Sequence, residues 1–228
     1  MSWPGFWSAY ARVYDSLCQL EPYRELVRDL VDRLAPCSLQ HILDAGCGTG
    51  QVTRAVQESC PTARVTGLDA SAAMLERAAR RGRWAELALV DLDGPLPFPD
   101  QWFDAIVSSN VLYSLPRPAF TLGELGRVMK PGGRLVLATP ASEFRLGALV
   151  TDQLARGWRH RARFLALLPA LVLVLLFNFA ILSRARQRTY HFFGPQELRG
   201  LLEASGFETV ELGRTYADQD WLVLAVKR

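Results

Sequence analysis

Three glycines at alternate positions follow a short apolar run, and they are the first candidate for a ligand site. Residues 44–50 (DAGCGTG) place an acid, Asp44, two positions before Gly46 and four before Gly48. Glycines directly after a strand allow a tight turn and let a ligand approach the backbone beside a helix N-terminus. A dinucleotide-binding turn would have its third glycine at Gln51. Because Asp44 would repel a pyrophosphate, the turn suits a ligand with an ammonium group better.

Polar side chains also follow three later apolar runs. Asp69 stands where nucleoside-binding sheets carry the carboxylate that accepts hydrogen bonds from both ribose hydroxyls. Asp91 and Leu92 come next along the chain, placed to border an adenine ring, and Ser109 closes a fourth run. Taken singly, Asp69 could instead cap the helix that follows, and Asp91 could be a turn residue.

Alternating strands and helices are predicted to position these residues. Apolar periodicity predicts strands at 41–45, 64–68, 86–90, 104–109 and 134–139, and helices at 23–34, 51–59, 72–81 and 119–129. Strands that alternate with helices in this way indicate βαβ units and a parallel sheet. A helix at 195–205 and two strands, 208–212 and 221–226, then predict a closing antiparallel hairpin. The predicted fold is α/β: a Rossmann-like, seven-stranded, mostly parallel sheet with helices on both faces.

The length of 228 residues suits one domain, 1–228, with its own core. Within it we expect a ligand-binding core at 36–140, an apolar and basic insertion at 143–190, and a segment at 191–228 that completes the sheet. The four cysteines show no metal-ligand spacing, so neither a metal site nor a disulfide framework is predicted. The N-terminus lacks the pattern of a signal peptide, and a reducing, cytoplasmic setting is expected.

Taken together, the motifs resemble the class I S-adenosylmethionine-dependent methyltransferases, in particular the branch that includes the ubiquinone/menaquinone C-methyltransferases. The resemblance covers roughly residues 10–140 closely and 190–228 more loosely. The motifs that carry it are 44–50 (DAGCGTG), 68–71 (LDAS) with Met74, 91–92 (DL), 96–98 (LPF), 103–108 (FDAIVS) and 127–134 (RVMKPGGR).

The resemblance implies S-adenosylmethionine as the cofactor. It places Gly46 and Gly48 under the methionine part, Asp69 on the ribose, and Asp91 and Leu92 beside the adenine. Tyr14, followed by an acid, resembles the family's N-terminal Tyr-Asp, whose ring helps to close the cofactor pocket. The expected cofactor-binding residues are Tyr14, Asp44, Gly46, Gly48, Asp69, Ala70, Met74, Asp91, Leu92 and Ser109.

The chain departs from the family at residues 112–114 (LYS), where relatives often carry histidine. The catalytic residue therefore stays unknown. Tyr113 and His191 are candidates by position alone, and a structural role is the alternative for His191. Because the sulfonium is already an activated methyl donor, a base matters only if the acceptor must lose a proton.

An apolar stretch at residues 164–182 is interrupted only by Pro169 and Asn178, and as a helix it would reach about 28 Å. A single pass through a membrane would separate residues 195–228 from the rest of the sheet, so we expect no spanning helix. A lid over a hydrophobic acceptor pocket, an interfacial helix and a buried core helix stay open. Eight arginines and a single acid lie between residues 144 and 190, which favours contact of 156–188 with anionic headgroups.

The expected function is methyl transfer to a hydrophobic or lipid-like acceptor by a cytoplasmic protein that is peripheral on the membrane surface. The alternatives are a soluble small-molecule methyltransferase with an apolar lid, and a cofactor-binding protein without transfer activity. Asp44 and the glycine spacing argue against a nicotinamide dehydrogenase. Nucleic acid is not an expected partner, because the arginines flank an apolar helix and no base-stacking aromatics lie between them.

Overall fold

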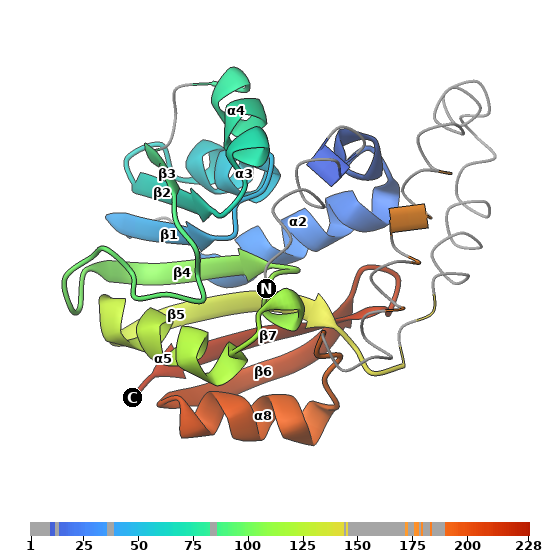
Figure 1. Ribbon diagram of the computed structural model, residues 1–228. Helices are drawn as coiled ribbons and strands as arrows, with labels where there is room; N and C mark the ends of the chain where they lie inside the picture. The colour runs from blue at the N-terminus through green and yellow to red at the C-terminus, as the bar shows by residue number, and fades with distance from the viewer. Residues whose placement is uncertain are drawn as a thin grey trace.

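A computed structural model describes residues 10–11, 14–35, 39–82, 86–143, 145, 172, 176–177, 179, 183 and 190–228. Its centre is one seven-stranded sheet in the order β3-β2-β1-β4-β5-β7-β6 (Figure 1). The strands are β1 (His41–Ala45), β2 (Arg64–Asp69), β3 (Glu86–Leu89), β4 (Phe103–Ser109), β5 (Met129–Pro140), β6 (Phe207–Thr215) and β7 (Asp220–Lys227). Strands β1 to β5 pair in parallel, and β7 pairs antiparallel with both β5 and β6. The predicted sheet and its closing hairpin are confirmed.

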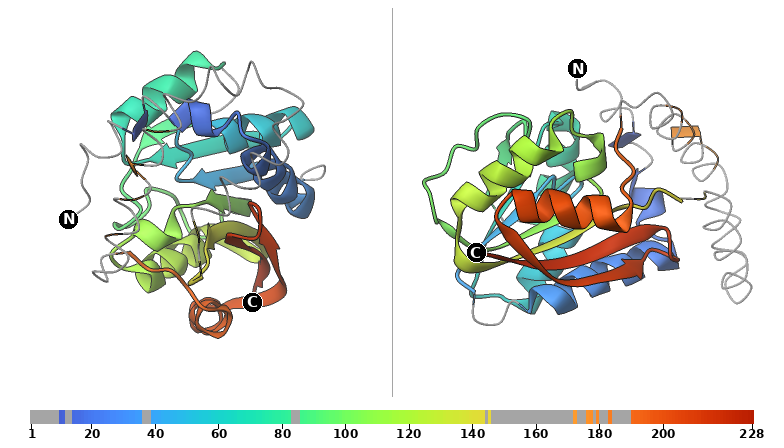
Figure 2. Two further views of the ribbon diagram at one scale, coloured as in Figure 1. Left: turned by 90° about the vertical axis from the view of Figure 1, so that its right-hand side faces the viewer. Right: turned by 90° about the horizontal axis from the view of Figure 1, so that it is seen from below.

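Helices cover both faces of the sheet, as expected. They are α2 (Glu21–Leu34), α3 (Gln51–Ser59), α4 (Ala72–Arg80), α5 (Pro118–Val128) and α8 (Pro195–Ala204), with a short 3₁₀ helix η2 (Leu112–Ser114) after β4. Figure 2 shows α5 and α8 on one side of the sheet and α2 on the other. Two apolar clusters correspond to these layers, one containing α2 and α3 and the other α5 and α8. The predicted insertion at 143–190 lies mostly outside the described residues.

Helix α2 illustrates how the apolar spacing fixes a layer. Leu26, Leu30 and Leu34 recur every fourth residue, so they share one face of the helix and are fully buried against the sheet. Each buried leucine contributes about 2 kcal/mol of transfer free energy. Pro22 stands in the first turn, where its missing N–H costs nothing, and the helix therefore begins at Glu21, two residues earlier than predicted.

The start of β5 differs from the sequence prediction. The strand begins at Met129, which was predicted to end the preceding helix, and not at Arg134. Met129 pairs with Phe103, and the next pair joins Arg134 to Ala105. The four residues between them form an irregularity that Gly132 allows with a φ of 73°. Apolar periodicity alone does not reveal such a bulge.

The hairpin brings the beginning of β7 to the edge where the parallel strands end. Asp220, the first residue of β7, lies opposite Pro140, the last residue of β5. Because β7 runs antiparallel to β5, its first residue shares an edge with the last residues of β4 and β5. This carboxyl edge is where open α/β sheets bind their ligands.

No helix formed by the described residues is both long enough and apolar enough to cross a membrane.

Candidate active site

The glycine turn between β1 and α3 has a backbone that other residues could not adopt without strain. Gly46, Gly48 and Gly50 have φ angles of 83°, 53° and 78°. The N–H of Gly46 donates to the carbonyl of Leu68 at 2.8 Å, which fixes the turn to the end of β2. A Cβ on Gly46 would lie 2.2 Å from Cγ2 of Val111, whereas a Cβ on Gly48 would meet no atom within 4 Å. Gly46 is thus needed for packing, and Gly48 leaves space beside the backbone.

Asp44, just before this turn, is buried, and only one of its two carboxylate oxygens accepts a hydrogen bond from the described residues. Its Oδ2 accepts a hydrogen bond from Thr53 Oγ1 at 2.6 Å. No described residue donates to its Oδ1. Burial raises the pKa of Asp44 to about 7, the nearby charge of Asp69 adds to the rise, and the hydrogen bond from Thr53 opposes it. A buried carboxylate oxygen without a donor is costly, so Asp44 is suited to receive a cationic donor from a ligand.

Asp69 joins the glycine turn to the start of α4. Its Oδ2 accepts from the N–H of Gly48 at 2.9 Å, and its Oδ1 accepts from the N–H of Ser71 at 2.8 Å. Burial raises the pKa of Asp69, and the two backbone hydrogen bonds oppose the rise. The helix cap is supplied by Ser71, whose Oγ accepts from the N–H of Met74 at 3.4 Å. Since each carboxylate oxygen can accept a second hydrogen bond, Asp69 retains the capacity to bind ribose hydroxyls.

Two further residues of the expected adenine side differ in exposure. Leu92 is buried, whereas Asp91 is exposed and accepts a hydrogen bond from the N–H of Asp93 at 3.0 Å through Oδ1. The geometry at Asp91 is that of a side-chain-closed turn, as the sequence allowed. Of the remaining expected residues, Met74 is buried and Ala70 is exposed.

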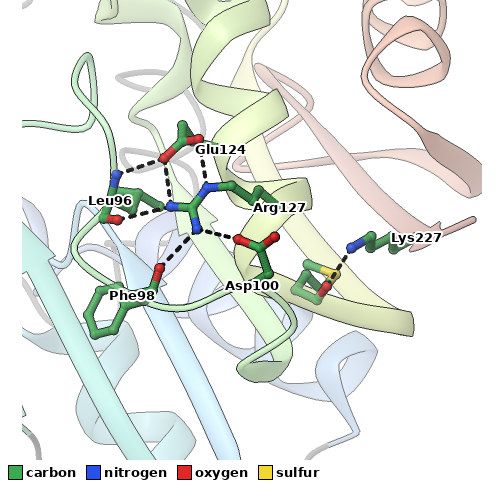
Figure 3. A network of polar contacts seen from close by, with 7 residues as sticks. Leu96, Phe98, Asp100, Glu124, Arg127 and Lys227 are labelled. Carbon is green, nitrogen blue, oxygen red and sulfur yellow. Dashed lines mark hydrogen bonds and ion pairs between the residues drawn. The ribbon is translucent and has the colours of Figure 1, made fainter.

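The loop after β3 is held in place by one arginine, a role that the sequence analysis missed. Figure 3 shows the guanidinium of Arg127 among two loop carbonyls and two carboxylates. It donates to the carbonyls of Leu96 and Phe98, both at 2.9 Å, and to Oδ1 of Asp100 at 2.8 Å. Glu124 binds the same guanidinium through both carboxylate oxygens, at 2.9 and 2.8 Å, and accepts from the N–H of Leu96. The hydrogen bonds from Arg127 lower the pKa of Glu124.

The N-terminal turn around Tyr14 is fastened to α4. Asp15 forms ion pairs with Arg77 at 3.4 Å and with Arg81 at 2.6 Å. The Tyr14 hydroxyl lies 3.3 Å from that of Tyr23 in α2. Tyr14 therefore has a fixed place beside α2 and α4.

The two candidate catalytic residues meet through the backbone. The N–H of His191 donates to the carbonyl of Tyr113 at 2.7 Å. The Tyr113 ring packs edge-to-face on Tyr190 and Phe192, with centroids 5.4 and 5.8 Å apart. Burial raises the pKa of Tyr113 well above its ordinary value, so its hydroxyl keeps its proton at neutral pH. The geometry suits Tyr113 to line a pocket or to donate a hydrogen bond, and not to act as a base.

A carboxylate that the sequence analysis did not single out lies at the same edge of the sheet. Asn110, directly after β4, donates from Nδ2 to Oδ2 of Asp220 at 2.8 Å. Asp220 is completely buried, and its Oδ1 has no donor among the described residues. Side-chain oxygens of Ser109, Asn110 and Thr139 nearby are likewise buried and unpartnered within the described part of the chain. The only signal in the sequence was an acid directly before the last predicted strand, 221–226, whereas the structure begins that strand at Asp220 itself.

Comparison with known proteins decides which family this site belongs to. A family model described as a methyltransferase domain matches residues 43–137. The demethylmenaquinone methyltransferase of Thermus thermophilus is 32% identical over 188 residues, which cover 81% of this chain and 80% of that protein. The chain belongs to the class I S-adenosylmethionine-dependent methyltransferases.

Two further likenesses agree with this membership. The malonyl-[acyl-carrier protein] O-methyltransferase of Hahella chejuensis is 33% identical over 161 residues, which cover 70% of this methyltransferase and 57% of that protein. The N-methyltransferase NodS of Bradyrhizobium japonicum, solved with S-adenosyl-L-homocysteine, superposes with a TM-score of 0.62 at 18% identity and covers 92% of this chain and 90% of its own. The predicted fold, enzyme class, cofactor and quinone-methyltransferase branch are confirmed.

The residues of the methyltransferase fit its cofactor, S-adenosylmethionine. The unpartnered Oδ1 of Asp44 can accept from an ammonium group, and the open space at Gly48 admits a ligand against the backbone. Tyr113, one of the two candidate catalytic residues, lies in a buried aromatic cluster.

Proposed function

We propose that this methyltransferase transfers the methyl group of S-adenosylmethionine to a hydrophobic, lipid-like acceptor at the carboxyl edge of its sheet. The methionine part would lie against Asp44, Gly46 and Gly48. The ribose and adenine would lie against Asp69 and Leu92. The other proposed cofactor contacts are Tyr14, Ala70, Met74, Asp91 and Ser109.

A set of aromatic rings at this edge carries the proposal of a hydrophobic acceptor. The Tyr10 ring contacts Phe177 and Tyr14, with centroids 4.9 and 5.4 Å apart. Tyr113 of η2 and Tyr190 continue the set, and Tyr10 is close enough to Tyr113 to add to the rise in its pKa that burial causes. Aromatic side chains with a few polar atoms among them are typical of sites for apolar ligands. The names of the relatives offer two acceptors, demethylmenaquinone and malonyl-[acyl-carrier protein], and the aromatic side chains favour a ring.

The described residues of the apolar stretch support contact with a membrane surface. Phe177 packs against both apolar clusters, whereas Val172, Leu176 and Phe179 are 53%, 60% and 66% exposed. Large apolar side chains on an outer face, flanked by arginines, are typical of an interfacial segment. Most of residues 156–188 lies outside the described residues, and membrane binding through this stretch is part of the proposal.

The cofactor supplies an activated methyl group when bound. The task of the chain is to hold the acceptor in line with that group and to exclude water. The buried aromatic cluster and the loop held by Arg127 perform both tasks in this proposal. A rigid edge matters here because a displacement of about 1 Å can cost on the order of 100-fold in rate.

The test is transfer of a labelled methyl group to a natural extract. The full chain is incubated with methyl-labelled S-adenosylmethionine and a total membrane extract, and the label is partitioned between organic solvent and water. Label in the organic phase is the expected result, and chromatography then identifies the acceptor. Label in water-soluble products alone would refute the lipid acceptor and indicate a soluble acceptor. Cofactor binding without any transfer would show a binding protein.

Retention on membranes tests the peripheral location separately. The expected result is sedimentation of the protein with anionic vesicles, reduced by salt. A variant with Leu176 and Phe179 changed to serine should sediment several-fold less, while the exposed Val210 on β6 changed to serine serves as the matched control. Equal sedimentation of both variants would refute the membrane contact.

A further inference from the structure

Asp220 is a completely buried acid with one carboxylate oxygen free of any described donor. Its Oδ2 is occupied by Asn110 Nδ2 at 2.8 Å. None of the arginines and lysines of the described residues forms an ion pair with it. Arg214, the cation with the strongest influence on it, pairs with Glu143 and stacks over the Trp221 ring at 3.6 Å. A buried oxygen in this state costs free energy unless a ligand supplies the hydrogen.

Asp220 lies on the same face and edge of the sheet as the cofactor residues. On β7, Leu222 and Leu224 belong to the cluster of α2, and the alternation of side chains puts Asp220 on that face. Ile42 on β1 belongs to the same cluster, so Asp44 shares the face. Strands β4 and β5 separate β1 from β7, a distance of about 14 Å at three strand spacings. That distance matches the combined length of the transferred methyl group and an acceptor ring that reaches Asp220.

We propose that Asp220 is a catalytic residue: its free oxygen Oδ1 binds a phenolic or enolic hydroxyl of the acceptor and takes the proton of that hydroxyl during methyl transfer. The inference rests on the proposal that the acceptor lies at this edge. In the step, the bond between sulfur and the methyl carbon breaks and its electron pair stays on sulfur. The acceptor forms the new bond to the methyl group and loses its hydroxyl proton to Asp220, which later releases that proton to water.

The surroundings of Asp220 suit a proton acceptor that works near neutral pH. Burial raises its pKa to about 7, and the hydrogen bond from Asn110 and the charge of Arg214 oppose the rise. Among the described residues, Tyr113 on η2 and Tyr216 in the turn before β7 also face it, and both keep their protons because burial raises their pKa values. A second carboxylate would be repelled here, so the site selects an acceptor with a hydroxyl and not one with a carboxylate.

The variant Asp220→Asn separates proton transfer from structure. An amide oxygen can still accept from Asn110, so the local structure is kept while the base is lost. The matched control is Asp29→Asn. Asp29 accepts from Thr215 Oγ1 at 2.6 Å, and Thr215 pairs with Asp220 across the hairpin. Each protein is assayed with labelled S-adenosylmethionine and either a prenylated 1,4-naphthoquinol or malonyl-acyl carrier protein.

Asp220→Asn should lower kcat for the naphthoquinol at least 100-fold, the lower end for loss of a general base. The wild-type kcat should rise with pH through about 7, and the variant should lack that rise. Cofactor affinity should stay within twofold, and Asp29→Asn should behave like the wild type. A kcat within threefold of wild type, or a preserved pH rise in Asp220→Asn, would overturn the proposal. Transfer to malonyl-acyl carrier protein alone would overturn it as well.

If the wild type methylates neither probe, the binding of a phenol tests the role of Asp220. In the presence of S-adenosylhomocysteine, 1-naphthol should bind the wild type about tenfold more tightly than Asp220→Asn, and equal or absent binding would overturn the proposal. The lipid acceptor and the role of Asp220 can fail separately. Transfer to a water-soluble phenol that depends on Asp220 refutes only the former, and transfer to a lipid that is independent of Asp220 refutes only the latter.

Discussion

Acidification should weaken cofactor binding through Asp44. The carboxyl is buried beside the glycine turn with a pKa of about 7 in the free protein, and it must be ionised to hold an ammonium group. Binding below pH 7 therefore requires that Asp44 release a proton. The amino group of S-adenosylmethionine, with an ordinary α-amino pKa near 8, stays charged between pH 5 and pH 7.

The size of the effect follows from the ionised fraction of Asp44. With a pKa of about 7, half of the molecules carry the carboxylate at pH 7 and about one in a hundred at pH 5. The dissociation constant should then rise about fiftyfold from pH 7 to pH 5. Asp44→Asn should bind about 10-fold to 100-fold more weakly at pH 7, the value of a hydrogen bond to a charged group, and should lose the pH dependence.

Isothermal titration calorimetry with S-adenosylmethionine at several pH values measures this coupling. Repeating it in two buffers of different ionisation enthalpy counts the protons released, about one per cofactor at pH 5.5. Asp29→Asn is the matched control, since this acid accepts a hydrogen bond from Thr215 away from the glycine turn, so its variant should keep the pH dependence. Equal affinity at pH 5 and pH 7, or a pH dependence that survives in Asp44→Asn, would refute the reasoning.

Three further predictions concern stability. Gly46→Ala should lower the free energy of unfolding by about 2–4 kcal/mol in urea titrations, because of its positive φ and its clash with Val111, and a second change, Val111→Ala, should recover part of the loss. Arg127→Lys cannot reproduce the planar set of hydrogen bonds and should cost about 2 kcal/mol, with faster hydrogen exchange at residues 91–100 as the local sign. Asp220 has a raised folded-state pKa, so its own contribution to stability should be greatest below pH 3.8 and should fall as the pH rises to about 7. Asp220→Asn should therefore be more stable than wild type at pH 8, by up to about 4 kcal/mol, and not at pH 4, as thermal melts can show.

The features that the sequence predicted depend on local signals. Asp44 and Asp69 each stand at the end of an apolar run, and a glycine or serine follows within two residues. Such signals locate the end of a strand and the start of the next helix without any knowledge of the tertiary structure. Because parallel strands end at one edge, local signals were enough to bring these acids to a common site.

The features that were missed depend on pairing between distant segments. The contact of Asn110 with Asp220 joins residues 110 positions apart and exists only because β7 pairs with β5 in one register. A shift of that register by one residue would turn Asp220 to the other face. The anchoring of the loop by Arg127 likewise depends on where α5 lies against residues 96–100. Periodicity specifies neither relationship.

The two buried acids divide the electrostatic work of methyl transfer between them. Asp44 keeps its charge throughout, because the ammonium it is proposed to hold is unchanged by the reaction. Asp220 would be a carboxylate while the bound donor is a cation, and a neutral acid once the sulfur has become a neutral thioether. The positive charge on sulfur and the negative charge on Asp220 would thus disappear in the same step, so no charged group of the reaction would remain in a poorly solvated site.

By this reasoning, the pKa of Asp220 should be lower with S-adenosylmethionine bound than with S-adenosylhomocysteine, because only the former carries the positive charge on sulfur. Carboxyl-labelled aspartate followed by NMR in both complexes measures the difference, and identical titrations would show that Asp220 does not sense the transferred charge.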